Sequence, residues 1–174
     1  RALTQFGRNP FFTGFSLMNR AEFYDELVLA ATTLASKKRG ALIVLGREVG
    51  LKTYIESGIA MESLVSYDIL VTIFAPSVPL HDGAAIVQKG RIEAAACFLP
   101  LTVNPRLSKE LGTRHRAAIG ITEETDAVVI VVSEENGSIS FAANGEIMRF
   151  LDSEGLRSRL RDAFESEEPK KLPR

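Results

Sequence analysis

The chain has two histidines, and each lies among residue types that could bind metal ions or phosphate. His81 and Asp82 come directly before Gly83 and an apolar run that is typical of a strand. A neutral imidazole and a carboxylate can both ligate a divalent metal. Gly83 would let a ligand approach the backbone closely, because it has no side chain. The alternative is an ordinary loop, in which Asp82 caps an Asp-Gly turn and His81 is exposed.

The second histidine lies in "GTRHR", residues 112–116. We expect Thr113 to be the N-cap of a helix, whose free N–H groups would attract phosphate. Arg114, His115 and Arg116 would add charge and donors there. Successive helical residues turn by about 100°, so the two arginines would point about 200° apart. They would then contact different parts of a long phosphate chain, or one would face another subunit. Ordinary ion pairing is the alternative, with Glu110, Glu123 or Glu124.

A third polar cluster, Ser133, Glu134 and Glu135, follows an apolar run and precedes Asn136-Gly137. A hydroxyl and two acids at a strand end suit metal or phosphate binding. The alternative is an ordinary solvated strand end, which is often acidic. The chain contains neither the G-x-x-x-x-G-K-[ST] nor the G-x-G-x-x-G pattern. It also lacks the Cys and His spacing of a zinc site. Any nucleotide would therefore be bound by another scheme.

Bulk composition narrows the function classes. The chain has 174 residues, a net charge of −1, 45% hydrophobic residues and 7% aromatic residues. This is typical of one globular domain, and it argues against a broad surface for nucleic acid. The lone Cys97 cannot form an internal disulfide, which favours a reducing, cytoplasmic setting. No apolar run reaches the length of a membrane span.

Periodic segments predict the elements that position these clusters. Asn19 and Glu22 form a capping box for a helix that would end at Gly40. Residues 41–45 read as a strand buried on both faces. Ser66 is expected to cap a helix that ends before Pro76. Strands in 84–88 and 91–98 would form a hairpin around Lys89-Gly90.

The remaining sequence continues this alternation. Residues 127–133 read as a buried strand, which Asn136-Gly137 would join to the next strand as a hairpin. Residues 145–164 read as helical, in two pieces that meet near Ser153. The fold class is therefore α/β: a single globular domain with a mixed central β-sheet surrounded by α-helices. We expect a leader in 1–18, the domain in 19–165 and a disordered tail in 166–174.

Several motifs together resemble the diadenylate cyclase domain family. Its two signature motifs, DGA and RHR, are present as Asp82-Gly83-Ala84 and as residues 114–116. The likeness runs from about residue 20 to about 152 and includes "GALIVLGRE", "YIESGI", "PLHDGA", "CFLPLT", "SKELGTRHRAAIGI" and "VVSEENG". "RALTQFGR" resembles the segment after the membrane helices in the membrane-anchored branch. The resemblance implies a soluble catalytic domain, separated from an N-terminal anchor at the cytoplasmic face of the membrane.

This family makes cyclic di-AMP from two ATP, releasing two pyrophosphates, with a divalent metal such as manganese, magnesium or cobalt. The resemblance implies that Asp82 is the catalytic carboxylate and that His81 and Asp82 hold the metal. The nucleotide-binding residues that it implies are Gly83, Ala84, Phe98, Leu99, Thr113, Arg114, His115, Arg116, Ser133, Glu134 and Glu135. Phe98 and Leu99 would line the adenine pocket, and residues 113–116 would hold the triphosphate.

The product is a two-fold symmetric ring, so two chains with one ATP each should meet face to face in a homodimer, at least transiently. A regulatory partner protein is typical of the membrane-anchored branch. The main alternative is a catalytically silent sensor of adenine nucleotides. A nucleic-acid-binding module is disfavoured by the net charge, and a different nucleotidyl transfer would be revealed by its products.

Overall fold

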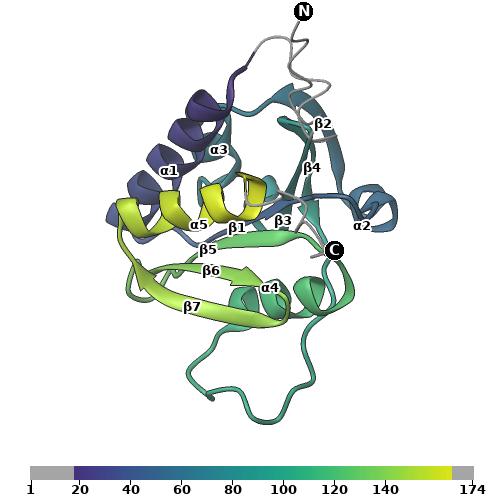
Figure 1. Cartoon of the computed structure of the whole chain (residues 1–174), viewed down its shortest axis with the longest axis vertical. Coiled ribbons are helices and arrows are strands. Elements are labelled where there is room, and N and C mark those ends of the chain that lie inside the picture. Colours follow the sequence, from purple (N-terminus) through teal and green to yellow (C-terminus); the bar gives the residue numbers. More distant parts are fainter. Residues whose placement is uncertain (1–17, 166–174) are drawn as a thin grey trace, which may run out of the picture.

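Seven strands form one mixed sheet through the centre of the molecule (Figure 1). The computed structural model describes residues 18–165. The strand order is β2-β4-β3-β1-β5-β6-β7, in which β1 and β3 are parallel and every other neighbouring pair is antiparallel. The strands are β1 (Ala41–Leu45), β2 (Ile59–Leu64), β3 (Ala84–Gln88), β4 (Arg91–Cys97), β5 (Val128–Val132), β6 (Ile139–Ala143) and β7 (Glu146–Leu151).

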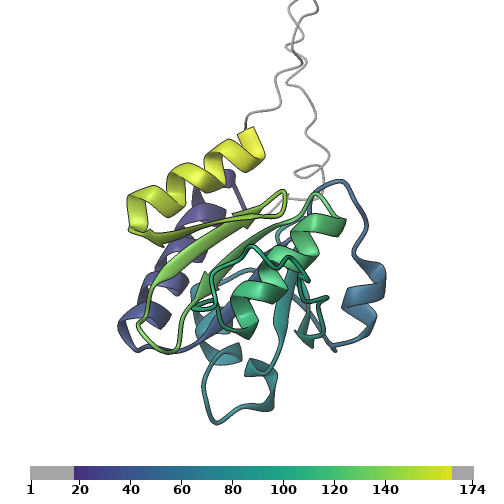
Figure 2. The ribbon, with the colours of Figure 1, turned by 90° about the horizontal axis from the view of Figure 1, so that it is seen from below.

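Helices cover both faces of this sheet. The helices within residues 18–165 are α1 (Arg20–Ser36), α2 (Lys52–Glu56), α3 (Tyr67–Ile73), α4 (Thr113–Glu124) and α5 (Ser153–Glu165), with a short 3-10 turn, η1 (Pro79–His81). One apolar cluster joins α1, α3 and α5 to one face, and a second joins α4 to the other (Figure 2). The predicted class, a mixed sheet surrounded by helices, is confirmed.

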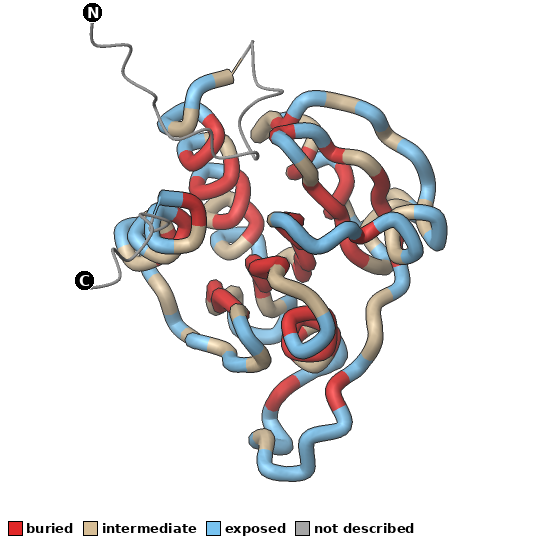
Figure 3. Tube along the Cα trace, turned by 45° about the vertical axis from the view of Figure 1, so that its right-hand side comes forward, coloured by how far each residue is buried: buried red, intermediate tan, exposed pale blue. Residues whose placement is uncertain are grey.

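The central strands are buried because helices cover both of their faces. All five residues of β1 and all five of β5 are buried, which explains why their sequences are continuously apolar rather than alternating (Figure 3). Along β1, Ile43 faces the α1 side and Leu42 and Val44 face the α4 side. The polar clusters of interest lie where these buried strands end.

Several local signals act as predicted. Asn19 caps α1 in a reciprocal capping box with Glu22, and Ser66 caps α3 by accepting from the Ile69 N–H. Lys89 and Gly90 both have positive φ, as a two-residue turn between β3 and β4 requires. Residues 133–138 connect β5 to β6 as an antiparallel hairpin.

The helix predicted from residue 145 is wrong in its first half. Residues 146–151 form β7, an edge strand whose side chains alternate between exposed and half-buried. The turn before it places Asn144 and Gly145 at positive φ, which is a hairpin signal that the apolar spacing had hidden. Only the second half is helical, beginning at Ser153. The sequence analysis did not predict α2 or β2.

Gly40 does not end the first helix. The helix ends at Ser36, and the residue with positive φ after it is Lys38. The predicted leader (1–18), apart from residue 18, and the predicted tail (166–174) lie outside the described residues. None of the helices in the described part of the chain is long and apolar enough to cross a membrane.

Candidate active site

A cavity of about 650 Å³ opens where β3, β4, α4 and the β5–β6 loop meet. Eight of the residues implied by the resemblance lie on its wall, which brings together segments far apart in the sequence. Its lining consists of Leu42, His81, Asp82, Gly83, Cys97, Phe98, Leu99, Leu101, Thr113, Arg114, Ala117 and Glu134. The cavity is therefore apolar over part of its wall and charged over the rest.

His81 and Asp82 lie at the end of η1, just before β3 enters the sheet. His81 Nδ1 donates to the Val78 carbonyl oxygen, because a carbonyl can only accept. This bond fixes the tautomer and leaves the Nε2 lone pair available for a metal ion. Asp82 is exposed, and within residues 18–165 its carboxylate has no hydrogen bond or ion pair. Both side chains therefore have ligand atoms free.

Gly83 is required by the sheet itself. Its φ is +131°, and a Cβ there would lie 2.7 Å from the Ala96 carbonyl carbon and 2.8 Å from the Cys97 oxygen. The β4 backbone is thus sufficient reason for a glycine here. Gly83 also lies on the cavity wall, so the expectation that a ligand approaches its backbone stays a prediction. Ala84 is fully buried in β3 and is not on the cavity wall.

The apolar part of the wall is formed by Phe98, Leu99 and Leu101 at the start of the loop between β4 and α4. This β4–α4 loop comprises residues 98–112. Phe98 is 76% exposed and Leu101 is 52% exposed, which is unusual for large apolar side chains beside a cavity. A flat aromatic ligand would find contact area here.

The helix α4 begins one residue earlier than predicted. Gly112 is the N-cap, no side chain of the described residues caps the helix, and Thr113 is the first helical residue. The prediction that Thr113 is the N-cap is therefore wrong. The glycine cap favours anion binding, because a threonine side chain at the N-cap would have accepted a hydrogen bond from one of the N–H groups that α4 presents to the cavity.

A second cavity of about 110 Å³ lies beside the first and shares Thr113, Arg114 and Glu134 with it. His115, Ser133 and Glu135 line it too. His115 is only 6% exposed, and its buried Nε2 has no hydrogen-bond partner within residues 18–165. Burial, then the charges of Arg149 and Arg114, lower the pKa of His115, while Glu135 acts in the opposite direction. A neutral imidazole with a free nitrogen thus faces a small polar pocket.

Arg114 and Glu134 form the wall between the two cavities. Arg114 Nη1 lies 3.1 Å from Glu134 Oε2, with the arginine mostly buried and the glutamate mostly exposed. Because the glutamate is exposed to water, such an ion pair contributes only about 1 kcal/mol, and a phosphate could take the place of the carboxylate.

Arg116 has a different role. Its Nε donates to the Leu111 carbonyl (3.2 Å) and its Nη2 to the Ser108 carbonyl (3.3 Å). It lines neither cavity and instead holds the β4–α4 loop against α4. The expectation that the two arginines point apart agrees with this geometry, and Arg116 contacts backbone rather than the acids considered above.

Some lining residues were not found by sequence reasoning. Arg149 on β7 lines the small cavity, and its Nη1 lies 3.8 Å from Glu110. It was missed because β7 was read as a helix. Cys97 lines the large cavity, where burial raises the pKa of its thiol to about 11, so it stays protonated and apolar at neutral pH.

The residues present fit a divalent metal only with help from a substrate. Within residues 18–165 no group of three or more His, Cys, Asp and Glu side chains is arranged to hold a metal ion. Magnesium, however, is commonly held by one or two carboxylates together with substrate phosphates and water. His81 and Asp82, with free ligand atoms on one cavity wall, suit that arrangement.

Comparison with known proteins gives consistent matches. Residues 28–147 match the family described as DisA bacterial checkpoint controller nucleotide-binding, abbreviated DAC. The chain is 46% identical over 167 residues to cyclic di-AMP synthase CdaA of Bacillus subtilis, covering 94% of this chain and 61% of that protein. It is 45% identical over 159 residues to a diadenylate cyclase of Listeria monocytogenes, covering 90% and 58%. The chain thus spans about three fifths of the length of these relatives.

Two solved structures share the fold. A DacA double mutant from Staphylococcus aureus superposes with a TM-score of 0.81 at 44% identity, covering 83% of this chain and 97% of that one. A Bacillus cereus protein described as a hypothetical membrane spanning protein gives a TM-score of 0.72 at 43% identity, covering 75% and 64%.

Proposed function

The chain belongs to the DAC nucleotide-binding family, and on that premise we propose that it is a diadenylate cyclase, which joins two ATP into cyclic di-AMP. Relatives at 45–46% identity carry the names cyclic di-AMP synthase and diadenylate cyclase. The observation that carries the proposal is the cavity wall. It combines an exposed aromatic residue, an uncapped helix N-terminus and a free carboxylate in one continuous site.

In each of the two bond-forming steps, a 3′-hydroxyl oxygen attacks an α-phosphorus. A new P–O bond forms, the bond to pyrophosphate breaks, and the hydroxyl proton passes to a base. Asp82 is that base, because its carboxylate is exposed on the cavity wall and makes no competing hydrogen bond among residues 18–165. Positioning and charge neutralisation supply most of the catalysis in such transfers.

The polar half of the wall binds the triphosphate. The free N–H groups at the start of α4 and the Arg114 guanidinium point to phosphate oxygens, and the small cavity lined by His115, Ser133 and Glu135 takes the terminal phosphates. His115 contributes a neutral donor, because its lowered pKa keeps it uncharged at neutral pH. Phe98 and Leu99 contact the adenine by stacking.

A divalent ion, manganese, magnesium or cobalt, is the expected cofactor, with His81 and Asp82 as its protein ligands. When bound, it neutralises phosphate charge beside the attacking hydroxyl. The His81–Val78 hydrogen bond orients the imidazole for this task.

Cyclic di-AMP is two-fold symmetric, whereas residues 18–165 of one chain bring these wall residues together once. Two chains must therefore bring their nucleotides face to face, and the active species is a homodimer, at least transiently. We also propose that the domain acts at the cytoplasmic face of the membrane. The Bacillus cereus relative, described as membrane spanning, supports this placement.

The test is product analysis. The domain is incubated with ATP and manganese or magnesium, and products are separated with mass detection. We expect cyclic di-AMP from the wild-type protein, and we expect Asp82→Asn to reduce kcat by about 100-fold or more. The unfolding midpoint of the variant should be unchanged, because the Asp82 side chain has no partner among the described residues. Retained turnover in Asp82→Asn would remove the residue from this role. ATP binding without product, even in a dimer forced by crosslinking, would favour a silent nucleotide sensor.

A further inference from the structure

Gly40 lies directly before β1. Its lack of a side chain makes room for Arg114 of α4 and has no part in ending α1. A Cβ at this position would lie 2.4 Å from Nη1, 2.5 Å from Cζ and 3.0 Å from Nε of Arg114. The whole guanidinium therefore lies against the backbone at Gly40, closer than any side chain would allow.

Backbone conformation does not explain this glycine. Gly40 is not among the glycines with positive φ, and α1 has already ended at Ser36. An alanine could adopt the same backbone, so its effect would come from the contact with Arg114 alone. The contacted atoms are the far end of a flexible side chain, so the fold can accommodate alanine by moving the guanidinium.

We propose that Gly40 is a positioning residue: it provides the space in which Arg114 is held at the wall shared by the two cavities. The guanidinium is fixed between the backbone at Gly40 on one side and Glu134 on the other, 3.1 Å from Nη1. A Cβ would push it by about 1 Å to restore an ordinary contact of 3.4 Å. The kinetic consequence rests on the proposed function, since it assumes that Arg114 holds phosphate.

The test compares Gly40→Ala with Gly50→Ala. Gly50 is a matched control, because nothing lies within 4 Å of its Cβ position and its φ is also not positive. We expect Gly40→Ala to lower kcat/KM for ATP by about 10- to 100-fold, since a misplacement of about 1 Å can cost that much. Gly50→Ala should retain the wild-type value. Equal kcat/KM values in Gly40→Ala and wild type would overturn the proposal.

A double-mutant cycle separates positioning from a general loss of structure. In an Arg114→Ala background, no guanidinium remains to be displaced. Adding Gly40→Ala there should change kcat/KM by less than about twofold and the unfolding midpoint by less than about 1 °C. An equally large loss in both backgrounds would show that Gly40 acts through the backbone, which contradicts the proposal.

A third measurement does not depend on catalysis. With arginine labelled by ¹⁵N, the Nε–Hε signal of Arg114, assigned by its absence in Arg114→Ala, should shift in Gly40→Ala and stay unchanged in Gly50→Ala. If the wild-type protein made no cyclic di-AMP, the proposed function would fail, yet this signal would still decide the role of Gly40. An unmoved signal in Gly40→Ala would refute it.

Discussion

At the scale of single residues, Arg114 and Arg116 show how one short motif serves two purposes. Arg114 forms a wall between two cavities, whereas Arg116 donates to carbonyls of Leu111 and Ser108. Their separation follows from helix geometry alone, since residues two apart point about 200° away from each other. The first arginine is thus available to a ligand, and the second maintains the loop that carries the apolar wall.

His115 between them should make stability depend on pH. Burial and the charges of Arg149 and Arg114 lower its pKa below 6.5, with Glu135 acting oppositely. Below about pH 6.5 the unfolded chain binds this proton more readily than the folded chain does. The contribution of His115 to the free energy of unfolding is therefore fully present above that pH, and it is lost as the pH decreases towards the lowered pKa. Urea unfolding at about pH 7.5 and about pH 5.5 measures this loss, which for one proton is at most about 1.4 kcal/mol per pH unit.

The comparison is His115→Gln, which keeps a polar side chain but cannot titrate in this range. We expect its stability to fall less between the two pH values than that of the wild-type protein, because the two proteins differ only at residue 115. An identical loss in both would mean that His115 does not gain a proton on unfolding. ATP should also reduce the loss, since phosphate in the small cavity favours the protonated imidazole.

The residue types of the site could be predicted from the sequence, but their partners could not. His81, Asp82 and the 112–116 motif were found because ionisable residues beside apolar runs stand out. The sequence did not show that Gly83 also lies against the β4 backbone, because only the register of the β3–β4 pair brings the two close. Arg149 could not have been found without knowing that β7 lies beside β6.

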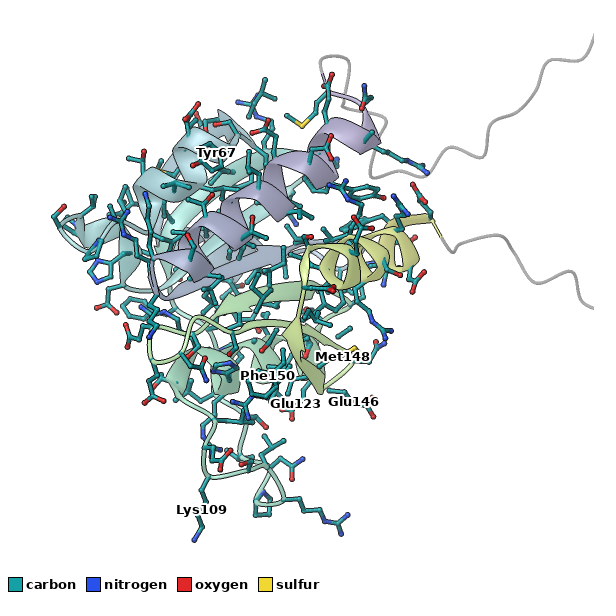
Figure 4. All side chains as sticks on the ribbon, turned by 90° about the vertical axis from the view of Figure 1, so that its left-hand side faces the viewer. Tyr67, Lys109, Glu123, Glu146, Met148 and Phe150 are labelled. Atoms are coloured by element: carbon teal, nitrogen blue, oxygen red, sulfur yellow. The ribbon has the colours of Figure 1, made fainter. Side chains whose placement is uncertain are left out.

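At the scale of elements, the β4–α4 loop depends on one helix for its position. Figure 4 shows Lys109 at the end of this loop that projects from the body, while Glu123 lies on the body itself. Near its start, the loop is held by Thr102 Oγ1 donating to Glu123 (2.7 Å) and by the Thr102 N–H donating to the Arg116 carbonyl. Gly120 faces the same segment, and a Cβ there would lie 2.0 Å from the Pro100 carbonyl oxygen.

Gly120→Ala should therefore destabilise the protein, although alanine normally stabilises a helix interior by about 1 kcal/mol relative to glycine. We expect a net loss of about 1–3 kcal/mol in the free energy of unfolding, because backbone at Pro100 must move. ATP affinity should fall too, since Phe98 and Leu99 belong to the displaced loop.

The control is Gly155→Ala in α5, where the nearest atom to a new Cβ is a carboxylate oxygen of Asp152 at 3.0 Å. That oxygen accepts from the Gly155 N–H (2.7 Å) and need shift by only a few tenths of an ångström. The substitution should therefore change the free energy of unfolding by less than about 1 kcal/mol. Urea unfolding of both variants gives the comparison. If Gly120→Ala were as stable as Gly155→Ala, the loop would not be held against α4 as described.

The elements themselves differed in how well the sequence predicted them. β1, β5 and the β3–β4 hairpin were recognisable because buried strands are continuously apolar and Lys89-Gly90 marks a turn. β7 was not, because Ile147, Met148, Phe150 and Leu151 have spacing that also fits a helix. Pairing with β6 decides this segment, and that contact is tertiary rather than local.

At the scale of the whole molecule, the cavity is open and bordered by exposed apolar side chains. Phe98 and Leu101 on its wall are largely exposed, and Val103, two residues after Leu101 in the same loop, is 93% exposed. A second chain placed face to face would cover these residues and close the site against water, as phosphoryl transfer requires. The specific activity of dilute protein should accordingly rise with protein concentration.

Mixing wild-type protein with Asp82→Asn tests how the two chains divide the reaction. If each Asp82 activates the hydroxyl in its own cavity, a mixed dimer can form one bond but cannot close the ring.

In an equal mixture that associates at random, about one quarter of the dimers are wholly wild type. The initial rate of cyclic di-AMP formation should then be about one quarter of that of wild-type protein at the same total concentration. The linear dinucleotide, still carrying one triphosphate, should accumulate from the mixed dimers. A rate between about one half and about three quarters, without the linear dinucleotide, would mean that the mixed dimers, about half of all dimers, close the ring with a single Asp82. The symmetric division of labour would then be wrong.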